Sequence, residues 1–325
     1  MKICFLDNTK FEYNSNDLYS YKLRGAESVL INLSSELTKL GHDVTVINNC
    51  YKNEFIKGVS WKKIQYYNDN KIFDIAISNG DTRLFEKTKS YKKILFSHSL
   101  QTLEKFFRKK QFFSYIKYRP KVVLLSDYHK ENTSKITTLF GSIKINWAAD
   151  LVFINSKLNE NIDNNLSIFT SRADRNLDLL INIWKELVYP RFSTGKLLVT
   201  PPLNNLSNSH NIFFRKTDNQ NHMIDDIKKS RIFLIPGHKA ELFCLSAQEA
   251  KELCVPIVTL GIGSLSERVI HGETGFVARN NAEFSDYVIE LYKNNDLWNK
   301  MRNNLIGTRG KNKWSNVAKN LLAKI

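Results

Sequence analysis

The chain has 325 residues, 42% of them hydrophobic, and a formal charge of +16 at pH 7, which fits a globular protein with room for two domains of roughly 150 residues. No apolar run approaches the ~18–20 residues that span a bilayer, and the four cysteines form no CxxC pair that would indicate structural zinc or a disulfide framework. A reducing cytoplasm is therefore the expected location. The charge favours an anionic partner, such as a nucleotide diphosphate, an acidic glycan, a phospholipid surface or nucleic acid, unless an AT-rich genome alone explains the many lysines.

The first half of the chain begins with a strand, helix and strand pattern. Lys2–Leu6 is a short apolar run, and the segment 26–40 places its leucines on one helical face. Gly41 follows where a helix C-cap glycine belongs, and the β-branched run within His42–Asn48 predicts the next strand. This is a βαβ unit. Further strands are expected at Phe73–Ser78, Lys93–Phe96, Val122–Ser126 and Ile143–Trp147.

The pattern restarts near Trp147–Asp150. Strands are expected at Ser167–Ser171, Leu197–Thr200, Asn211–Phe214, Ile232–Pro236 and Pro256–Leu260, and helices at Leu177–Val188, Ser246–Leu253, Ala282–Lys293, Leu297–Leu305 and Val317–Lys324. We therefore expect an α/β fold with two Rossmann-like domains, over residues 1–150 and 151–325, whose parallel sheets face a central cleft. The last helix of the second domain could cross back to the first.

Two carboxylates stand out in the second half, Glu241 and Glu249, separated by seven residues. Glu241 lies in the loop after a predicted strand, and Glu249 lies in the following helix. The backbone amides of Cys244, Leu245 and Ser246 would open that helix, and a helix N-terminus suits a diphosphate. Glu241 can then sit beside a sugar ring while Glu249 reaches a ribose, since carboxylates accept from vicinal hydroxyls. Incidental glutamates in a Rossmann half are the alternative.

The segment from Pro236 to Val277 resembles the signature of retaining glycosyltransferases with the GT-B fold, group 1 (glycosyltransferase family 4). That signature reads Glu-Gly-Phe-Gly, then Glu-Ala; this chain has Glu241-Leu-Phe-Cys and Glu249-Ala. A later run, His271-Gly-Glu-Thr-Gly-Phe-Val, is similar to the family's "HGxTGxLV" hairpin. The resemblance implies that residues around Glu241 and Glu249 bind the donor. These are Gly237, His238, Phe243, Cys244 and Leu245.

Two other regions resemble the same family. Arg24-Gly25-Ala-Glu is similar to its "GGAE" pattern, with Arg24 in place of the first glycine, and the resemblance implies that this loop contacts the donor phosphate or the acceptor. Arg172 and Arg175 match the Arg and Lys that clamp the pyrophosphate, where cations stabilise the charge of the leaving phosphate. Asn176 replaces the family's next glycine, a departure that a left-handed turn could tolerate.

His98 follows a first-domain strand, where the family often has a histidine over the sugar, although a structural role is the alternative; His129 is a weaker candidate of the same kind. The resemblance implies transfer of a hexose from a donor such as UDP- or GDP-hexose, bound to the second domain, to a glycan or lipid-linked acceptor bound to the first. Retention and independence from metals or other cofactors are implied too. No DxD motif is present, and Gly261-Ile-Gly263 lacks the third glycine of an NAD fingerprint.

Aromatic and basic residues interleave over 105–119. This pattern suits an interfacial helix on an anionic membrane surface, or an ordinary helix with its aromatic residues in the core. Three further functions remain open: a nucleotide-sugar epimerase or phosphorylase on the same fold, a non-catalytic glycan-binding relative, and a basic nucleic-acid-binding protein. The last is disfavoured because no helix-turn-helix, RRM or zinc motif is visible, so we expect no nucleic-acid partner.

Overall fold

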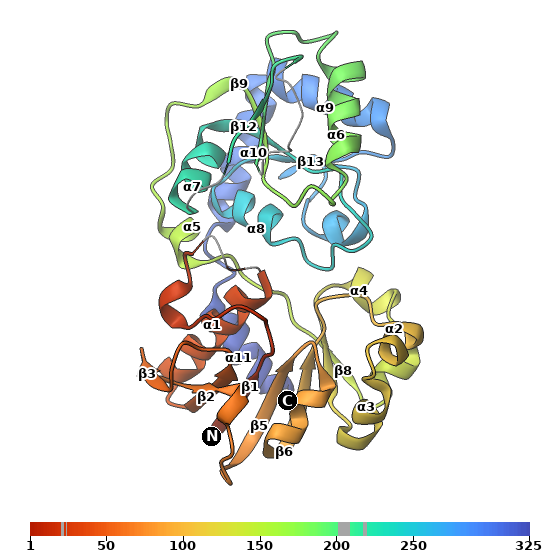
Figure 1. The fold of residues 1–325 in the computed structure, drawn as a ribbon. Coiled ribbons are helices and arrows are strands. Elements are labelled where there is room, and N and C mark those ends of the chain that lie inside the picture. The colour runs from red at the N-terminus through yellow and green to blue at the C-terminus, as the bar shows by residue number, and fades with distance from the viewer. Residues whose placement is uncertain (21–22, 24, 201–208, 217–219) are drawn as a thin grey trace. The chain divides into compact units, whose positions relative to one another are not determined.

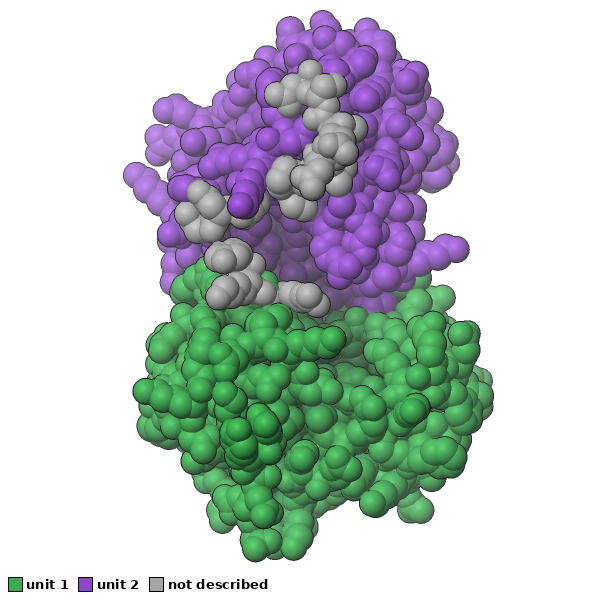
Figure 2. Space-filling model, in the orientation of Figure 1, with its two compact units in different colours: residues 1–147, 314–325 green, residues 148–313 purple. Residues whose placement is uncertain are grey.

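The computed structural model describes residues 1–20, 23, 25–200, 209–216 and 220–325. The chain forms two compact units: unit 1 comprises residues 1–147 and 314–325, and unit 2 comprises residues 148–313 (Figure 2). Each unit is an α/β structure built on a mainly parallel sheet (Figure 1). The predicted fold class of two α/β domains is therefore confirmed.

The described strands of unit 1 form an eight-stranded sheet in the order β3-β4-β2-β1-β5-β6-β7-β8. They are β1 (Lys2–Leu6), β2 (Asp43–Asn48), β3 (Glu54–Ile56), β4 (Val59–Lys63), β5 (Ile72–Asn79), β6 (Lys89–Phe96), β7 (Lys121–Leu124) and β8 (Ser142–Lys144). Neighbouring strands are parallel apart from the β3–β4 pair at the edge. β1 is central, with β2 and β5 on its two sides, and its four residues from Ile3 to Leu6 are buried because helices cover both faces of a parallel sheet.

The helices of unit 1 include one formed by the end of the chain. They are α1 (Gly25–Lys39), α2 (Leu103–Arg108), α3 (Phe112–Tyr118), α4 (Asp127–Glu131) and α11 (Trp314–Lys324), with short 3-10 turns η1 (Ser15–Asp17), η2 (Ile64–Tyr66), η3 (Thr82–Lys87) and η4 (Lys135–Thr138). α11 packs against α1, and Trp314 contacts Trp147 with ring centroids 5.9 Å apart. α1 ends as predicted at Gly41, with a φ of +84° and a bond from the His42 amide to the Leu37 carbonyl.

The described strands of unit 2 form a six-stranded parallel sheet in the order β11-β10-β9-β12-β13-β14. Its strands are β9 (Asp163–Phe169), β10 (Lys196–Val199), β11 (Ile212–Phe214), β12 (Ser230–Leu234), β13 (Ile257–Thr259) and β14 (Gly275–Val277). Its helices are α5 (Leu151–Asn155), α6 (Leu177–Ile183), which continues as the π-helix η5 (Trp184–Val188), α7 (Gln220–Lys229), α8 (Leu245–Glu252), η6 (Gly263–Glu267), α9 (Asn281–Lys293) and α10 (Asn295–Thr308). One continuous hydrophobic core lies between sheet and helices.

Three sequence expectations were wrong in detail. The expected helix over Phe106–Arg119 is two short helices, because Lys110 adopts a left-handed φ of +54° between α2 and α3. The expected hairpin over 271–277 is a turn that leads into β14, which pairs in parallel with β13. The strand expected at Ile143–Trp147 is β8, which ends at Lys144.

Two glycines of unit 2 provide a test of this packing. A Cβ at Gly275 would lie 2.1 Å from the Ile257 carbonyl oxygen, whereas a Cβ at Gly307 in α10 meets nothing within 4 Å. Gly275→Ala should therefore lower the free energy of unfolding by at least about 2 kcal/mol, since backbone must move. Gly307→Ala should raise it by roughly 0.5–1 kcal/mol. Urea unfolding measures both; equal effects would contradict the β13–β14 register.

Candidate functional site

The unit 2 sheet has its switch point between β9 and β12. From β9 the chain adds β10 and β11 on one side, while β12, β13 and β14 extend the sheet on the other. A crevice forms at the carboxyl ends of two such strands because their following loops diverge, and ligands of open α/β sheets bind there. The loop after β9 carries Arg172 and Arg175, and the loop after β12 carries Gly237, His238 and Glu241. The switch point thus brings these two predicted segments together.

An ion pair joins the two loops. Arg175 Nε lies 2.6 Å from Glu241 Oε1, and the side chains are only 15% and 14% exposed. A second carboxylate, Asp174, lies 3.0 Å from Arg175 Nη1 and 2.6 Å from Arg172 Nη2. The structure therefore places Arg175 and Glu241 in direct contact, while Arg172, 72% exposed, lies on the surface beside them.

Backbone geometry locks the same two loops. Asn176 adopts the left-handed conformation (φ +62°, ψ +35°), as its position predicted, and its Nδ2 donates to the Gly237 carbonyl at 2.5 Å. Gly237 itself has a φ of +98°, and a Cβ there would lie 2.5 Å from the Ile262 carbonyl oxygen. His238 Nδ1 accepts from the Ala240 amide at 3.0 Å, which tightens the turn toward Glu241. The position of Glu241 is thus fixed by backbone contacts.

Helix α8 begins directly after this turn. Cys244 precedes it with a left-handed φ of +62°, at the position where the family signature has glycine, and burial raises the pKa of its thiol. Phe243 is buried beneath the Arg268 guanidinium, 4.5 Å from the ring centroid. The first amides of α8, at Leu245 and Ser246, have no acceptor within the helix because a helix leaves its first N–H groups unbonded. A helix N-terminus with free amides of this kind can bind an anion.

Glu249 lies in the second turn of α8 and is partly buried. Among the described residues, no hydrogen-bond donor or cation pairs with its carboxyl group. Burial, together with the charge of Asp150, raises the pKa of Glu249 to about 8. Such a carboxyl group makes the folded state less stable at neutral pH, which makes Glu249 a candidate site residue.

Unit 1 contains a cavity at its own switch point, between β1 and β5. Its volume is about 450 Å³, within the range of small-molecule sites. The residues that line it come from the ends of β1, β5 and β6 and from the starts of α1 and α3: Asp7, Asn8, Thr9, Ala26, Glu27, Asn79, Gly80, Asp81, Arg83, His98, Ser99, Gln101, Lys109 and Gln111. Of the residues predicted from the sequence, His98 lies here.

A chain of hydrogen bonds orients His98. Its Nε2 lies 2.5 Å from Asn79 Oδ1, Asn79 Nδ2 donates to Asp7 Oδ1 at 2.8 Å, and the Tyr13 hydroxyl donates to Asp7 Oδ2 at 2.9 Å. Because Asn79 Oδ1 only accepts, Nε2 carries the proton and Nδ1 presents a lone pair. Burial lowers the pKa of His98 to about 4, so the ring is neutral at pH 7.

His129 has a different role. Its ring is fully buried, Nδ1 accepts from the Leu125 amide at 3.1 Å, and Nε2 contacts Ser97 Oγ at 3.3 Å. It does not line the cavity, and burial lowers its pKa to about 4. These contacts make His129 a structural residue of the β7–α4 turn.

Sequence reasoning missed most of the cavity. Asp7 follows β1 directly, and Asn79 and Asp81 lie at the end of β5, so polar residues right after two adjacent buried strands were the available signal. Gly25 is the first residue of α1 and is exposed; the cavity wall begins with the next residue, Ala26. Arg24 lies outside the described residues.

In the described parts of the chain, no three His, Cys, Asp or Glu side chains are grouped to hold a metal ion. The helices described there include none with the length and apolar character needed to cross a membrane.

Comparison with known proteins follows the same division of the chain. Residues 153–307, nearly all of unit 2, match the family model "Glycosyl transferases group 1". A search of curated proteins finds no match to the sequence.

Solved structures of similar fold cover almost the whole chain. A glycosyltransferase from Rickettsia africae superposes with a TM-score of 0.70 at 14% identity, over 99% of this chain and 97% of that one. HepE from Anabaena, in complex with UDP and glucose, gives 0.69 at 13% identity over 100% and 99%. Sucrose-phosphate synthase from Thermosynechococcus elongatus gives 0.68 at 12% identity over 99% and 98%. At these identities the likeness establishes the fold, which is the GT-B fold named from the sequence.

The raised pKa of Glu249 generates a stability test. The unfolded chain loses this proton near pH 4.5 and the folded chain near 8, so the folded state becomes less stable as the pH rises through that window. Glu249→Gln should therefore raise the free energy of unfolding at pH 8, by roughly 1–3 kcal/mol. Glu283→Gln is the matched control: Arg279 lowers the pKa of Glu283 to about 2, so this change should give no gain. Urea unfolding at pH 5 and pH 8 measures both; a loss of stability in Glu249→Gln at pH 8 would contradict the assignment.

Proposed function

We propose that this chain, whose residues 153–307 match the group 1 glycosyltransferases, transfers a hexose from a nucleoside-diphosphate sugar to a glycan or lipid-linked acceptor, with retention and without a metal ion. One observation carries this proposal. At the switch point of unit 2, the Arg175–Glu241 ion pair joins the loops after β9 and β12, and Glu249, unpaired among the described residues, lies in helix α8. The cation and the open helix end suit a diphosphate. The two carboxylates suit the hydroxyls of a sugar, at Glu241, and of a ribose, at Glu249.

Arg175 and Arg172 would bind the diphosphate. Without a ligand, Arg175 is neutralised by Glu241 and Asp174. A phosphate offers the guanidinium a stronger, bidentate partner. Glu241 would then be released to accept hydrogen bonds from hydroxyls of the transferred hexose. The pair thus holds both groups in place until the donor arrives.

The chemistry follows from where charge develops. The bond between the anomeric carbon and the β-phosphate oxygen breaks, the acceptor oxygen bonds to the same face of that carbon, and the acceptor proton passes to a leaving phosphate oxygen. Negative charge grows on the diphosphate, where Arg175, Arg172 and the amides of Leu245 and Ser246 would stabilise it. These fixed positive groups would do the work of a divalent cation.

The remaining residues would shape the donor site. Glu249 would accept from the ribose hydroxyls, and the turn through Gly237 and His238, with Phe243, Cys244 and Leu245, would line it. The UDP and glucose bound in the Anabaena structure make UDP-glucose the first donor to test. Acceptor binding would belong to unit 1, where His98 would accept from a hydroxyl through Nδ1. Gly25 at the start of α1 is proposed to contribute, as is Arg24, which lies outside the described residues.

The proposal includes contact of residues 105–119 with an anionic membrane surface. Phe106 and Tyr115 anchor α2 and α3 in the core at 1% exposure, whereas Phe113 is 79% and Phe107 50% exposed. The exposed basic and apolar residues of these helices and of the turn between them form what we call the basic-aromatic patch: Phe107, Arg108, Lys109, Lys110, Phe113, Ile116, Lys117 and Arg119. The acidic Glu104 at the start of α2 is also exposed. Exposed rings among five cations suit insertion at the level of anionic headgroups.

Nucleotide binding tests the donor site. In calorimetric titrations of UDP, GDP and ADP without metal, one nucleotide should bind at micromolar concentration. Arg175→Ala should weaken that diphosphate about 10–100-fold but leave its nucleoside unaffected, because the guanidinium meets only phosphate. Glu249→Gln should weaken both. Arg279→Ala, which removes an 87% exposed arginine of unit 2, is the control. If no nucleotide binds, a glycan-binding relative replaces the transferase.

Vesicle binding tests the patch. In sedimentation with vesicles of 70% phosphatidylcholine and 30% phosphatidylglycerol, Phe107→Ser/Phe113→Ser should reduce the bound fraction at least about tenfold, because two rings lose their apolar environment. Phe55→Ser is the matched control, since Phe55 is 74% exposed on the edge strand β3. Equal binding of the wild type and both variants to these vesicles would contradict the proposed contact through the patch. Equal binding of the wild type to vesicles of pure phosphatidylcholine would contradict a preference for an anionic membrane.

A further inference from the structure

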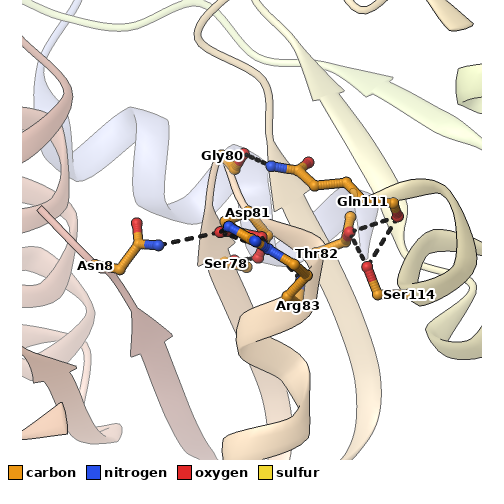
Figure 3. Close-up of polar contacts among 8 residues, drawn as sticks. All are labelled: Asn8, Ser78, Gly80, Asp81, Thr82, Arg83, Gln111 and Ser114. Atoms are coloured by element: carbon orange, nitrogen blue, oxygen red, sulfur yellow. Dashed lines mark hydrogen bonds and ion pairs between the residues drawn. The ribbon is translucent and has the colours of Figure 1, made fainter. Parts of the chain in front are cut away.

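The turn between α2 and α3 is hydrogen-bonded to the loop that follows β5. Gln111 is 4% exposed, and its Nε2 donates to the Gly80 carbonyl at 3.2 Å. The Gln111 carbonyl accepts from Thr82 Oγ1 at 3.0 Å and from Ser114 Oγ at 2.9 Å (Figure 3). Main chain and side chain of one buried residue thus join the α2–α3 turn and the start of α3 to the loop that follows β5.

The same turn belongs to two features at once. Lys109 and Gln111 line the unit 1 cavity, and Lys109 and Lys110 are part of the basic-aromatic patch. The cavity wall and the patch are therefore continuous along the chain, with no intervening element. A molecule that occupies the cavity at this wall lies next to whatever surface the patch contacts.

The cavity has two chemical ends. At the ends of β1 and β5, Asp7, Asn79 and neutral His98 present oxygen and nitrogen acceptors, which suit hydroxyl groups. At the α2–α3 wall, Lys109 is exposed and has no ion-pair partner among the described residues. Burial lowers the pKa of Lys105, and the charges of Lys109 and Arg108 lower it further. This wall of the cavity is therefore electropositive.

The other cation of the cavity is already neutralised. Arg83 donates to Asp81 through Nε at 3.0 Å and Nη2 at 2.6 Å, and Asp81 also accepts from Asn8 Nδ2 at 3.0 Å (Figure 3). Asp81 further caps η3 by accepting from the Arg83 amide. This pair is held by four contacts, so among the described residues that line the cavity the charge available to an anionic ligand is that of Lys109.

From this arrangement we infer that the acceptor is a lipid-linked sugar joined to its lipid through an anionic phosphate linkage. Its sugar hydroxyls meet Asp7, Asn79 and His98, its phosphate meets Lys109, and its lipid remains in the bilayer that the basic-aromatic patch contacts. The inference rests on the proposed transfer reaction and selects one of its two acceptor classes. A freely diffusing glycan would need neither the electropositive wall nor its continuity with the patch.

Label transfer tests the inference. The protein is incubated with the radiolabelled hexose donor of the nucleotide that binds in titration. Two acceptor pools are offered: total lipids of the cells that make the protein, in phosphatidylcholine–phosphatidylglycerol vesicles, and the water-soluble glycans of the same cells. We expect label in the butanol-extractable product of the lipid pool. Lys109→Glu should reduce that label at least fivefold, whereas Lys52→Glu, an equal charge change at an exposed lysine of unit 1, should not.

The outcomes separate the two claims. Label found only in water-soluble glycans, or equal label with Lys109→Glu and wild type, would overturn the lipid-linked acceptor and leave the transferase intact. Release of hexose to water with no label in either pool would also overturn the lipid-linked acceptor, while showing that the donor is cleaved. If the protein bound no nucleotide in the preceding titration, the transferase itself would fail. Circular dichroism and thermal unfolding of both lysine variants confirm that each is folded.

Discussion

The partly buried ion pair between Arg175 and Glu241 is the interaction on which the proposed donor site depends. Two opposite charges 2.6 Å apart stabilise each other where either alone would be costly to bury. They meet because β9 and β12 are neighbours at the switch point, and because Asn176 in its left-handed turn reaches the Gly237 carbonyl. Fixed in this way, the cation can exchange one carboxylate for a diphosphate without reorganising the loops, which is the condition for electrostatic stabilisation of a leaving group.

Unit 1 applies the same geometric rule to different chemistry. Its switch point between β1 and β5 gathers Asp7, Asn79 and His98 from three adjacent strand ends. The described cation at these strand ends, Arg83, is paired with Asp81. Hydrogen bonds through Asn79 fix one tautomer of His98, and burial keeps it neutral. In the proposed reaction, unit 2 would present positive charge to the leaving diphosphate and unit 1 would present acceptors to hydroxyls.

The sequence predicted correctly those features that depend on interactions between residues close together in the chain. The apolar face of α1, the glycine that ends it and the left-handed Asn176 all follow from residues near in sequence. The edge strand β3 and its neighbour β4 were missed because they carry no apolar run, and the break at Lys110 was missed because lysine rarely adopts a positive φ. The cavity could not be predicted without the strand order, which places Asn79 beside His98 although 19 residues separate them in the sequence. The raised pKa of Glu249 could not be predicted from the spacing of residues in the sequence, because it arises from the burial of the side chain in the folded unit.

The stereochemistry of donor cleavage tests the central claim most directly. An α-linked nucleotide sugar, beginning with UDP-glucose, would be incubated with the protein at high concentration without acceptor, and proton NMR would follow the anomeric signals before mutarotation. Transfer to water on the face left by the phosphate predicts that α-hexose appears first, and that Arg175→Ala suppresses its release. First appearance of the β-anomer would contradict retention, and undiminished release by Arg175→Ala would contradict the role of the ion pair in binding the diphosphate.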